Sequence, residues 1–145
     1  MALAMPLSHA QSLWDGESRV PDKFARAVTE HLRQNFWGKM KLPNGEVAEP
    51  ATENERKGIP IPERLAYSLV TAGVLSAKAE ECELKTDAFE LRVLRAAWQT
   101  YPGLNQVTFS GTLLSLAKAT VKRQPTVEIC SAANRDGFAQ LLGIK

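Results

Sequence analysis

The sequence contains few of the residues that mark specialised chemistry or a specialised environment. It has only two cysteines, Cys82 and Cys130, and no apolar run that approaches the roughly 20 residues of a membrane-spanning helix. A secreted domain held together by disulfides usually carries more cysteines in a shorter chain. We therefore expect both thiols to be reduced and to bind no metal. We also expect no membrane-spanning segment.

The sequence also lacks a large excess of positive or of negative charge. The 18 lysines and arginines nearly balance 16 aspartates and glutamates, which leaves a formal net charge of +2. This balance neither requires nor excludes a nucleic-acid partner. The first residues lack the basic start of a signal peptide, and His9 and Gln11 interrupt their weakly apolar stretch. These features predict a cytoplasmic protein.

Motifs for catalysis, metals and cofactors are absent as well. A structural zinc site needs closely spaced cysteines or histidines, and the two histidines and two cysteines are scattered. The sequence holds neither a Gly-x-Ser-x-Gly elbow nor a glycine-rich phosphate loop. Acidic pairs such as Glu80 and Glu81 lie in charged stretches, where solvent does not raise a carboxyl pKa. We expect a protein that is not an enzyme and has no catalytic, cofactor or metal site.

Amphipathic helices are what the sequence does contain. Two stretches place an apolar residue at every fourth position, on one helix face: Phe24, Val28, Leu32 and Phe36, and then Phe89, Val93, Ala97 and Tyr101. Similar patterns predict further helices starting at Pro62, at Ser110 as an N-cap, and at Ser131. The prediction is an all-α protein, a compact bundle of about five helices forming one domain over residues 1–145.

The connecting segments differ in composition from the helices. Residues 42–61 hold three prolines, two glycines and six charged residues, which predicts a long mobile loop after the first main helix. A turn at 43–45 could close one minor β-hairpin within it. Residues 1–20 read as a loosely ordered arm. Two short β-prone runs, 107–109 and 126–129, either pair as strands or form extended connectors.

Basic residues gather in two of the predicted helical regions, around 21–41 and 110–123. Cations along a surface can follow phosphates, so these regions are candidate nucleic-acid contacts. Acidic residues such as Asp22 and Glu30 interleave with them, and a charged helix face is usually only solvated. The connections between helices are also longer than a strict helix-turn-helix allows. The candidate contacts are Lys23, Arg26, Arg33, Lys39, Lys41, Lys118, Lys122 and Arg123.

Two tryptophans lie near the ends of predicted segments. Trp14 and Trp37 have the amphipathic ring that often anchors a protein interface, although such rings also cover the edges of a small core. With no sign of catalysis, we expect a regulatory or adaptor protein that acts by binding a protein partner. A DNA- or RNA-binding regulatory protein that uses the two basic regions is the alternative.

Overall fold

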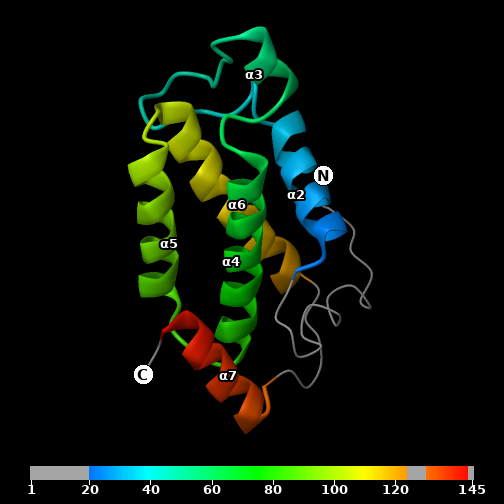
Figure 1. Cartoon of the computed structure of the whole chain (residues 1–145), viewed down its shortest axis with the longest axis vertical. Coiled ribbons are helices and arrows are strands. Elements are labelled where there is room, and N and C mark those ends of the chain that lie inside the picture. Colours follow the sequence, from blue (N-terminus) through cyan, green and yellow to red (C-terminus); the bar gives the residue numbers. More distant parts are fainter. Residues whose placement is uncertain (1–19, 124–129, 144–145) are drawn as a thin grey trace.

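The structure, a computed structural model, describes residues 20–123 and 130–143 and is all-α over these residues. Figure 1 shows α4, α5 and α6 along the length of the molecule, with α7 across the end near the C-terminus. Over the same residues no helix is both long and apolar enough to cross a membrane. The helices are α2 (Asp22–Gln34), α3 (Glu53–Lys57), α4 (Glu63–Glu81), α5 (Asp87–Thr100), α6 (Leu104–Lys122) and α7 (Ala132–Leu142).

The centre of the core is the contact between α4 and α6. Gly73 of α4 makes this contact close, because a Cβ added there would lie 2.4 Å from the carbonyl oxygen of Leu114. Leu69 and Leu113 are fully buried in the same core. Helix α2 adds Phe24, Val28 and Leu32 of the predicted stripe, and Phe36 follows in the turn after the helix; each of the four is almost completely buried. The expected bundle of helices around an apolar core is therefore confirmed.

Most of the predicted helix starts are correct. Pro62 directly precedes α4, and the Ser131 hydroxyl accepts a hydrogen bond from the backbone N–H of Asn134 at the start of α7. The start of α6 was predicted wrongly. The helix begins at Leu104, so that Ser110 lies buried in its interior and is not an N-cap.

The same correction applies to the β-prone run Val107–Phe109, which is helical. The backbone N–H of Gly103 donates to the side-chain oxygen of Gln106 at 3.0 Å, and this bond caps the start of α6 at Leu104. Burial of Phe109 against Phe36, with ring centroids 5.0 Å apart, outweighs the weak β preference of this run. The second β-prone run, 126–129, lies outside the described residues.

Residues 42–61 contact the helical body and contain the short helix α3. The expected hairpin is reduced to one antiparallel bridge between Lys41 and Val47. Two side chains at the start of α6 also bind this segment. The side-chain amide of Asn105 donates to the Glu49 carbonyl at 3.0 Å, and that of Gln106 donates to the Pro60 carbonyl at 3.2 Å. The mobility of this segment stays a prediction, but these bonds connect it to the start of α6.

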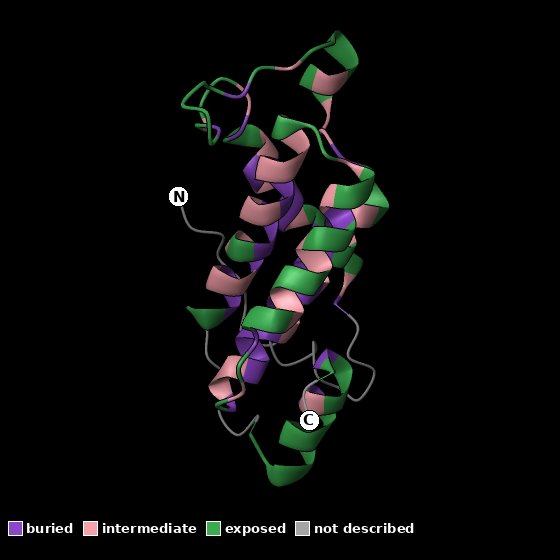
Figure 2. Ribbon diagram, turned by 90° about the vertical axis from the view of Figure 1, so that its left-hand side faces the viewer, coloured by how far each residue is buried: buried purple, intermediate pink, exposed green. Residues whose placement is uncertain are grey.

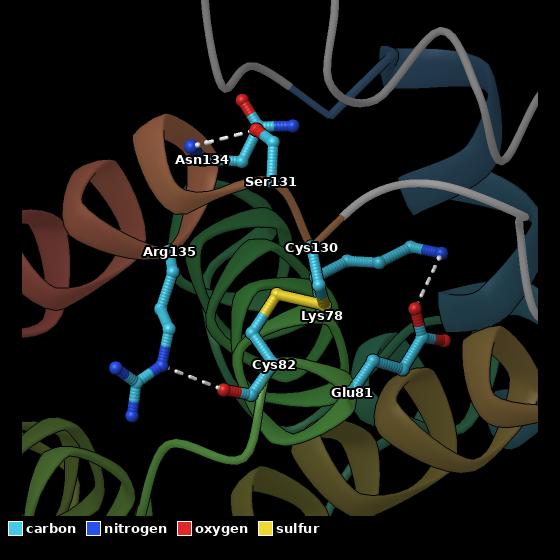
Figure 3. Close-up of a disulfide and its surroundings, with 7 residues drawn as sticks. All are labelled: Lys78, Glu81, Cys82, Cys130, Ser131, Asn134 and Arg135. Atoms are coloured by element: carbon cyan, nitrogen blue, oxygen red, sulfur yellow. Dashed lines mark hydrogen bonds and ion pairs between the residues drawn. A yellow bond between two sulfur atoms is a disulfide. The ribbon is translucent and has the colours of Figure 1, made fainter.

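The two cysteines form a disulfide, so the expectation of reduced thiols is wrong. Cys82 follows α4, Cys130 precedes α7, and their Cα atoms lie 5.1 Å apart although 48 positions separate them in sequence. Figure 3 shows the bond, with the Arg135 side chain donating to the Cys82 carbonyl at 3.0 Å. The sequence does not reveal this pair, because Cys82 and Cys130 become neighbours only when the fold places the start of α7 beside the end of α4.

Candidate protein interface on α5 and α6

The predicted basic residues of α6 are engaged in ion pairs within the chain. Lys118 pairs with the carboxylates of Glu80 on α4 and Glu90 on α5, and the Lys118 Nζ lies 2.7 Å from Glu90 Oε2. Lys122 pairs with Glu80 as well. Thr86 completes this network, since its hydroxyl lies 2.7 Å from Glu80 Oε2 and 2.8 Å from Glu90 Oε2. Its single hydrogen donates to one carboxylate at a time.

The network shifts the titration of its members. Burial alone would raise the pKa of Glu80, but hydrogen bonds from Lys118, Lys122 and Thr86 outweigh it and lower that pKa to about 2. The pKa of Glu90 is lowered for the same balance of reasons. The network therefore holds α4, α5 and α6 together and leaves Lys118 and Lys122 poorly placed to meet phosphates.

Lys78 is a further charged residue that the sequence did not single out. It is fully buried, and its Nζ lies 3.5 Å from a carboxylate oxygen of Glu81 one helical turn later, as Figure 3 shows. Burial lowers the pKa of Lys78, while the Glu81 carboxylate opposes that shift. The position inside the core, beside the disulfide, suits a structural role.

The basic residues around α2 have a different setting. Arg33 forms a bidentate pair with Glu30, and Lys39 donates to the backbone carbonyl of Gln34 at 2.9 Å. The Tyr67 hydroxyl beside the exposed Arg26 guanidinium raises the pKa of Arg26. The remaining candidates are exposed side chains: Lys23, Lys41 and Arg123.

These cations do not converge with those of α6. Arg26 and Arg33 line a cleft of about 250 Å³ that also includes Glu63 at the start of α4. Glu80, which holds Lys118 and Lys122, lies at the other end of that helix, roughly 25 Å away at 1.5 Å per residue. The cleft near α2 mixes both signs, since Glu30 and Glu63 face the two arginines. The structure thus brings together two of the predicted cations, but not one continuous basic face.

The two tryptophans have separate outcomes. Trp37 is half-buried, and its indole N–H donates to the carbonyl of Gly58 at 3.0 Å. Its ring meets that of Phe36 edge to face, with centroids 5.0 Å apart. Trp37 therefore connects the 42–61 segment to the turn that follows α2, and its ring covers the edge of the core. Trp14 lies outside the described residues.

The outward side of α5 is the feature that stands out, because Leu91 is exposed there beside the half-buried side chains of Leu94 and Trp98. Only Ala97 of this helix is buried, and Leu91 is 42% exposed. Leu94 and Trp98 follow Leu91 at three and seven positions, so the three side chains share one face. Figure 2 looks onto this side of the molecule, where the ribbon of α5 is mainly green and pink.

The outer face of α6 continues this surface and is uncharged. No residue from Leu104 to Ala117 carries a charge, although Leu104 is 39% exposed and Ser115 is exposed. A shallow groove of about 570 Å³ is lined by Leu94, by small residues of α6 such as Gly111, and by residues 41–43, which include Lys41. We call this surface the α5–α6 face; its members are Leu91, Leu94, Trp98, Leu104, Gly111 and Ser115.

The sequence held the signal for this face, but a stronger pattern hid it. The stripe from Phe89 to Tyr101 is the side of α5 that packs against the rest of the bundle, and Leu94 at its edge packs there as well. The second stripe, from Leu91 to Trp98, has helical spacing too, and a sequence does not say which of two apolar stripes meets the core. Across the described parts of the chain, no group of three or more histidine, cysteine, aspartate or glutamate side chains is arranged to hold a metal.

Comparisons with protein-family models, with curated proteins and with solved structures found no match to this chain.

Proposed function

We propose that this chain is a non-enzymatic regulatory or adaptor protein that binds a protein partner through the α5–α6 face. The observation that carries the proposal is the exposed Leu91 of α5, which shares a helix face with the half-buried Leu94 and Trp98 and lies beside the uncharged stretch of α6 and its groove. A helix face that is exposed to water normally carries charged and polar side chains, while the apolar side chains lie on the opposite, buried face. A face that pairs exposed leucines with a groove in which Lys41 is the one charged residue among the described residues that line it is typical of an interaction surface.

The composition of the α5–α6 face resembles the centre of a protein interface. Such centres contain aromatic residues and few charged ones, as this face does with Trp98 and the uncharged stretch of α6. The small residues at Gly111 and Ser115 allow another backbone to come close, and Leu94 of α5 lines the same groove. A helix from a partner is the element that suits such a groove.

The nucleic-acid alternative has weaker support. Lys118 and Lys122 already neutralise Glu80 and Glu90, and the cations near α2 share their cleft with two glutamates. Phosphate binding needs cations that are available along one surface. Titration of duplex and single-stranded DNA and RNA at low salt tests this alternative, and we expect no binding that depends on Lys118 or Lys122.

The cellular location is part of the same proposal. The cytoplasmic location expected from the sequence stays a prediction. Disulfides persist mainly in oxidising compartments, so the bond between Cys82 and Cys130 favours a compartment of that kind instead. A partner is therefore to be sought first among proteins that meet oxidising conditions.

The test compares two exposed leucines on different faces. Leu91 lies on the α5–α6 face, and Leu141 on α7 is 51% exposed and serves as the matched control. We expect the wild-type chain in a native cell extract to elute from a gel-filtration column as a complex larger than the free chain. The Leu91→Glu variant should elute as the free chain, and Leu141→Glu should elute like wild type.

Both substitutions lie at exposed positions, so circular dichroism should show the same helix content in all three proteins. A Leu91→Glu variant that elutes like wild type, with its helix content intact, would contradict the proposal.

A further inference from the structure

The exposed stripe of α5 has a symmetric order about Leu91. Asp87 lies four positions before Leu91 and Arg95 four positions after it, while Ala88 and Leu94 lie three positions to either side. At 100° per residue these side chains fall within a third of a helical turn, centred on Leu91. Among these five residues Leu94 is thus matched by Ala88, Arg95 by Asp87, and Leu91 by itself.

We propose that the partner of the α5–α6 face is a second copy of this chain, packed with α5 antiparallel to α5 about a two-fold axis at Leu91. This inference rests on the proposed function, because it uses the same face and names its occupant. In an antiparallel helix pair, residues equally far before and after the axis face each other. A two-fold interface requires a surface that is complementary to itself, and the stripe about Leu91 meets that requirement.

The charges at the ends of the stripe support this occupant. About this axis Asp87 of one copy faces Arg95 of the other, and the symmetry repeats the pair. Both side chains are exposed, and among the described residues neither has a hydrogen bond or an ion pair within its own chain. The two groups are therefore available to a second copy, and the opposite orientation of the helices would place like charges together.

The apolar residues between the charges fit the same arrangement. Leu91, which is 42% exposed in the single chain, would meet its own copy at the axis. Leu94 would meet Ala88, a large residue against a small one, as packed helices require. The second α5 would then also cover the outer face of α6, where a Cβ added to Gly111 meets no atom within 4 Å.

Sedimentation equilibrium of the purified chain tests the proposal by charge reversal. We expect a monomer–dimer equilibrium at concentrations between about 1 µM and 1 mM, the range of weak interfaces. Asp87→Arg alone and Arg95→Asp alone should each weaken the dimer by about tenfold, because each places like charges together twice. The combined variant restores opposite charges, and we expect its dissociation constant to return to within about threefold of wild type.

Cross-linking provides a second readout at the axis. A Leu91→Cys variant should form a disulfide between two copies under mild oxidation, since residue 91 faces itself, and a Leu141→Cys variant should not. A monomer at all concentrations, no rescue in the combined variant, or equal cross-linking at both positions would each overturn the proposal.

These outcomes separate the two proposals. If the purified chain is a monomer but Leu91→Glu still disrupts the larger complex in extract, the face binds a different protein and only the second copy is refuted. If Leu91→Glu disrupts neither assembly, both proposals fail.

Discussion

Helices α4 and α5 contact each other, yet they are covered to very different extents. Ten of the 19 residues of α4 are buried, against one of the 14 residues of α5. Helix α4 lies between α2, α5, α6 and α7, whereas α5 contacts the bundle along one side and keeps Leu91 exposed on the other, with Trp98 half-buried beside it. The difference shows that apolar residues on α5 serve two surfaces, one inside the bundle and one facing outward.

The strongest way to test this comparison is to truncate one leucine from each surface. Leu113→Ala removes a fully buried side chain from the α4–α6 contact and should lower the free energy of unfolding by about 2–5 kcal/mol. Leu91→Ala removes an exposed side chain and should change it by less than about 0.5 kcal/mol. Urea denaturation of the monomeric chain at low concentration measures both values. Equal losses at the two positions would show that α5 is part of the core.

The disulfide holds the opposite end of α4 to α7. Replacing Cys82 and Cys130 by Ala together should lower the free energy of unfolding by about 2–4 kcal/mol, because the bond closes a long loop in the unfolded chain. A reducing agent should destabilise the wild-type chain and leave the double variant unchanged. A wild-type chain that is as stable with reducing agent as without it would argue that the bond does not form in solution.

Acid should weaken the junction of α4, α5 and α6. The pKa of Glu80 is lowered to about 2 in the folded chain, so its contribution is present above the ordinary value of 4.5 and is lost as the pH falls from 4.5 towards 2. We expect a loss on the order of 2 kcal/mol over this interval, and a flatter curve for Glu80→Gln. Thermal denaturation from pH 6 to pH 2 measures the change.

Glu30 is the matched control for this acid effect. The hydrogen bond from Arg33 lowers the pKa of Glu30 as well, but this pair is open to solvent, where ion pairs contribute little. Glu30→Gln should therefore leave the pH profile nearly as in wild type. A profile flattened equally by both substitutions would remove the special role of the α4–α5–α6 network.

Two glycines in helix interiors allow the smallest and most closely matched comparison. Gly73→Ala should lower the free energy of unfolding by about 1–3 kcal/mol, because the new Cβ meets the Leu114 carbonyl oxygen and the α4–α6 contact cannot open freely. Gly111→Ala meets no atom within 4 Å and should raise it by about 0.5–1 kcal/mol through helix propensity. Denaturation at low protein concentration measures both. Destabilisation by Gly111→Ala would show that the outer face of α6 is already covered.

The helical class and the face of α2 were predictable because spacing alone encodes them. The stripe from Phe24 to Phe36 is long and regular, so the periodicity indicated its buried side correctly. The start of α6 was not predictable in this way, since the cap at Gly103 depends on the side chain of Gln106 folding back. Local signals thus suffice where one helix face repeats over several turns.

Features that join distant positions were missed for a different physical reason. The pairing of Cys82 with Cys130, and of Lys118 with Glu80 and Glu90, depends on which helix ends meet in space. No pattern along the chain reports that distance. The basic residues of α6 were read as a surface patch because their carboxylate partners lie 28 or more positions away.

Site-specific photo-cross-linking shows directly whether a protein covers the α5–α6 face. One variant carries a photoreactive amino acid in place of Leu91, and a second variant carries it in place of Leu141. Each variant is irradiated in the native cell, and its cross-linked adducts are identified by mass spectrometry. We expect a defined protein adduct at position 91 and none at position 141. No adduct at position 91, or the same adducts at both positions, would contradict the proposed interface.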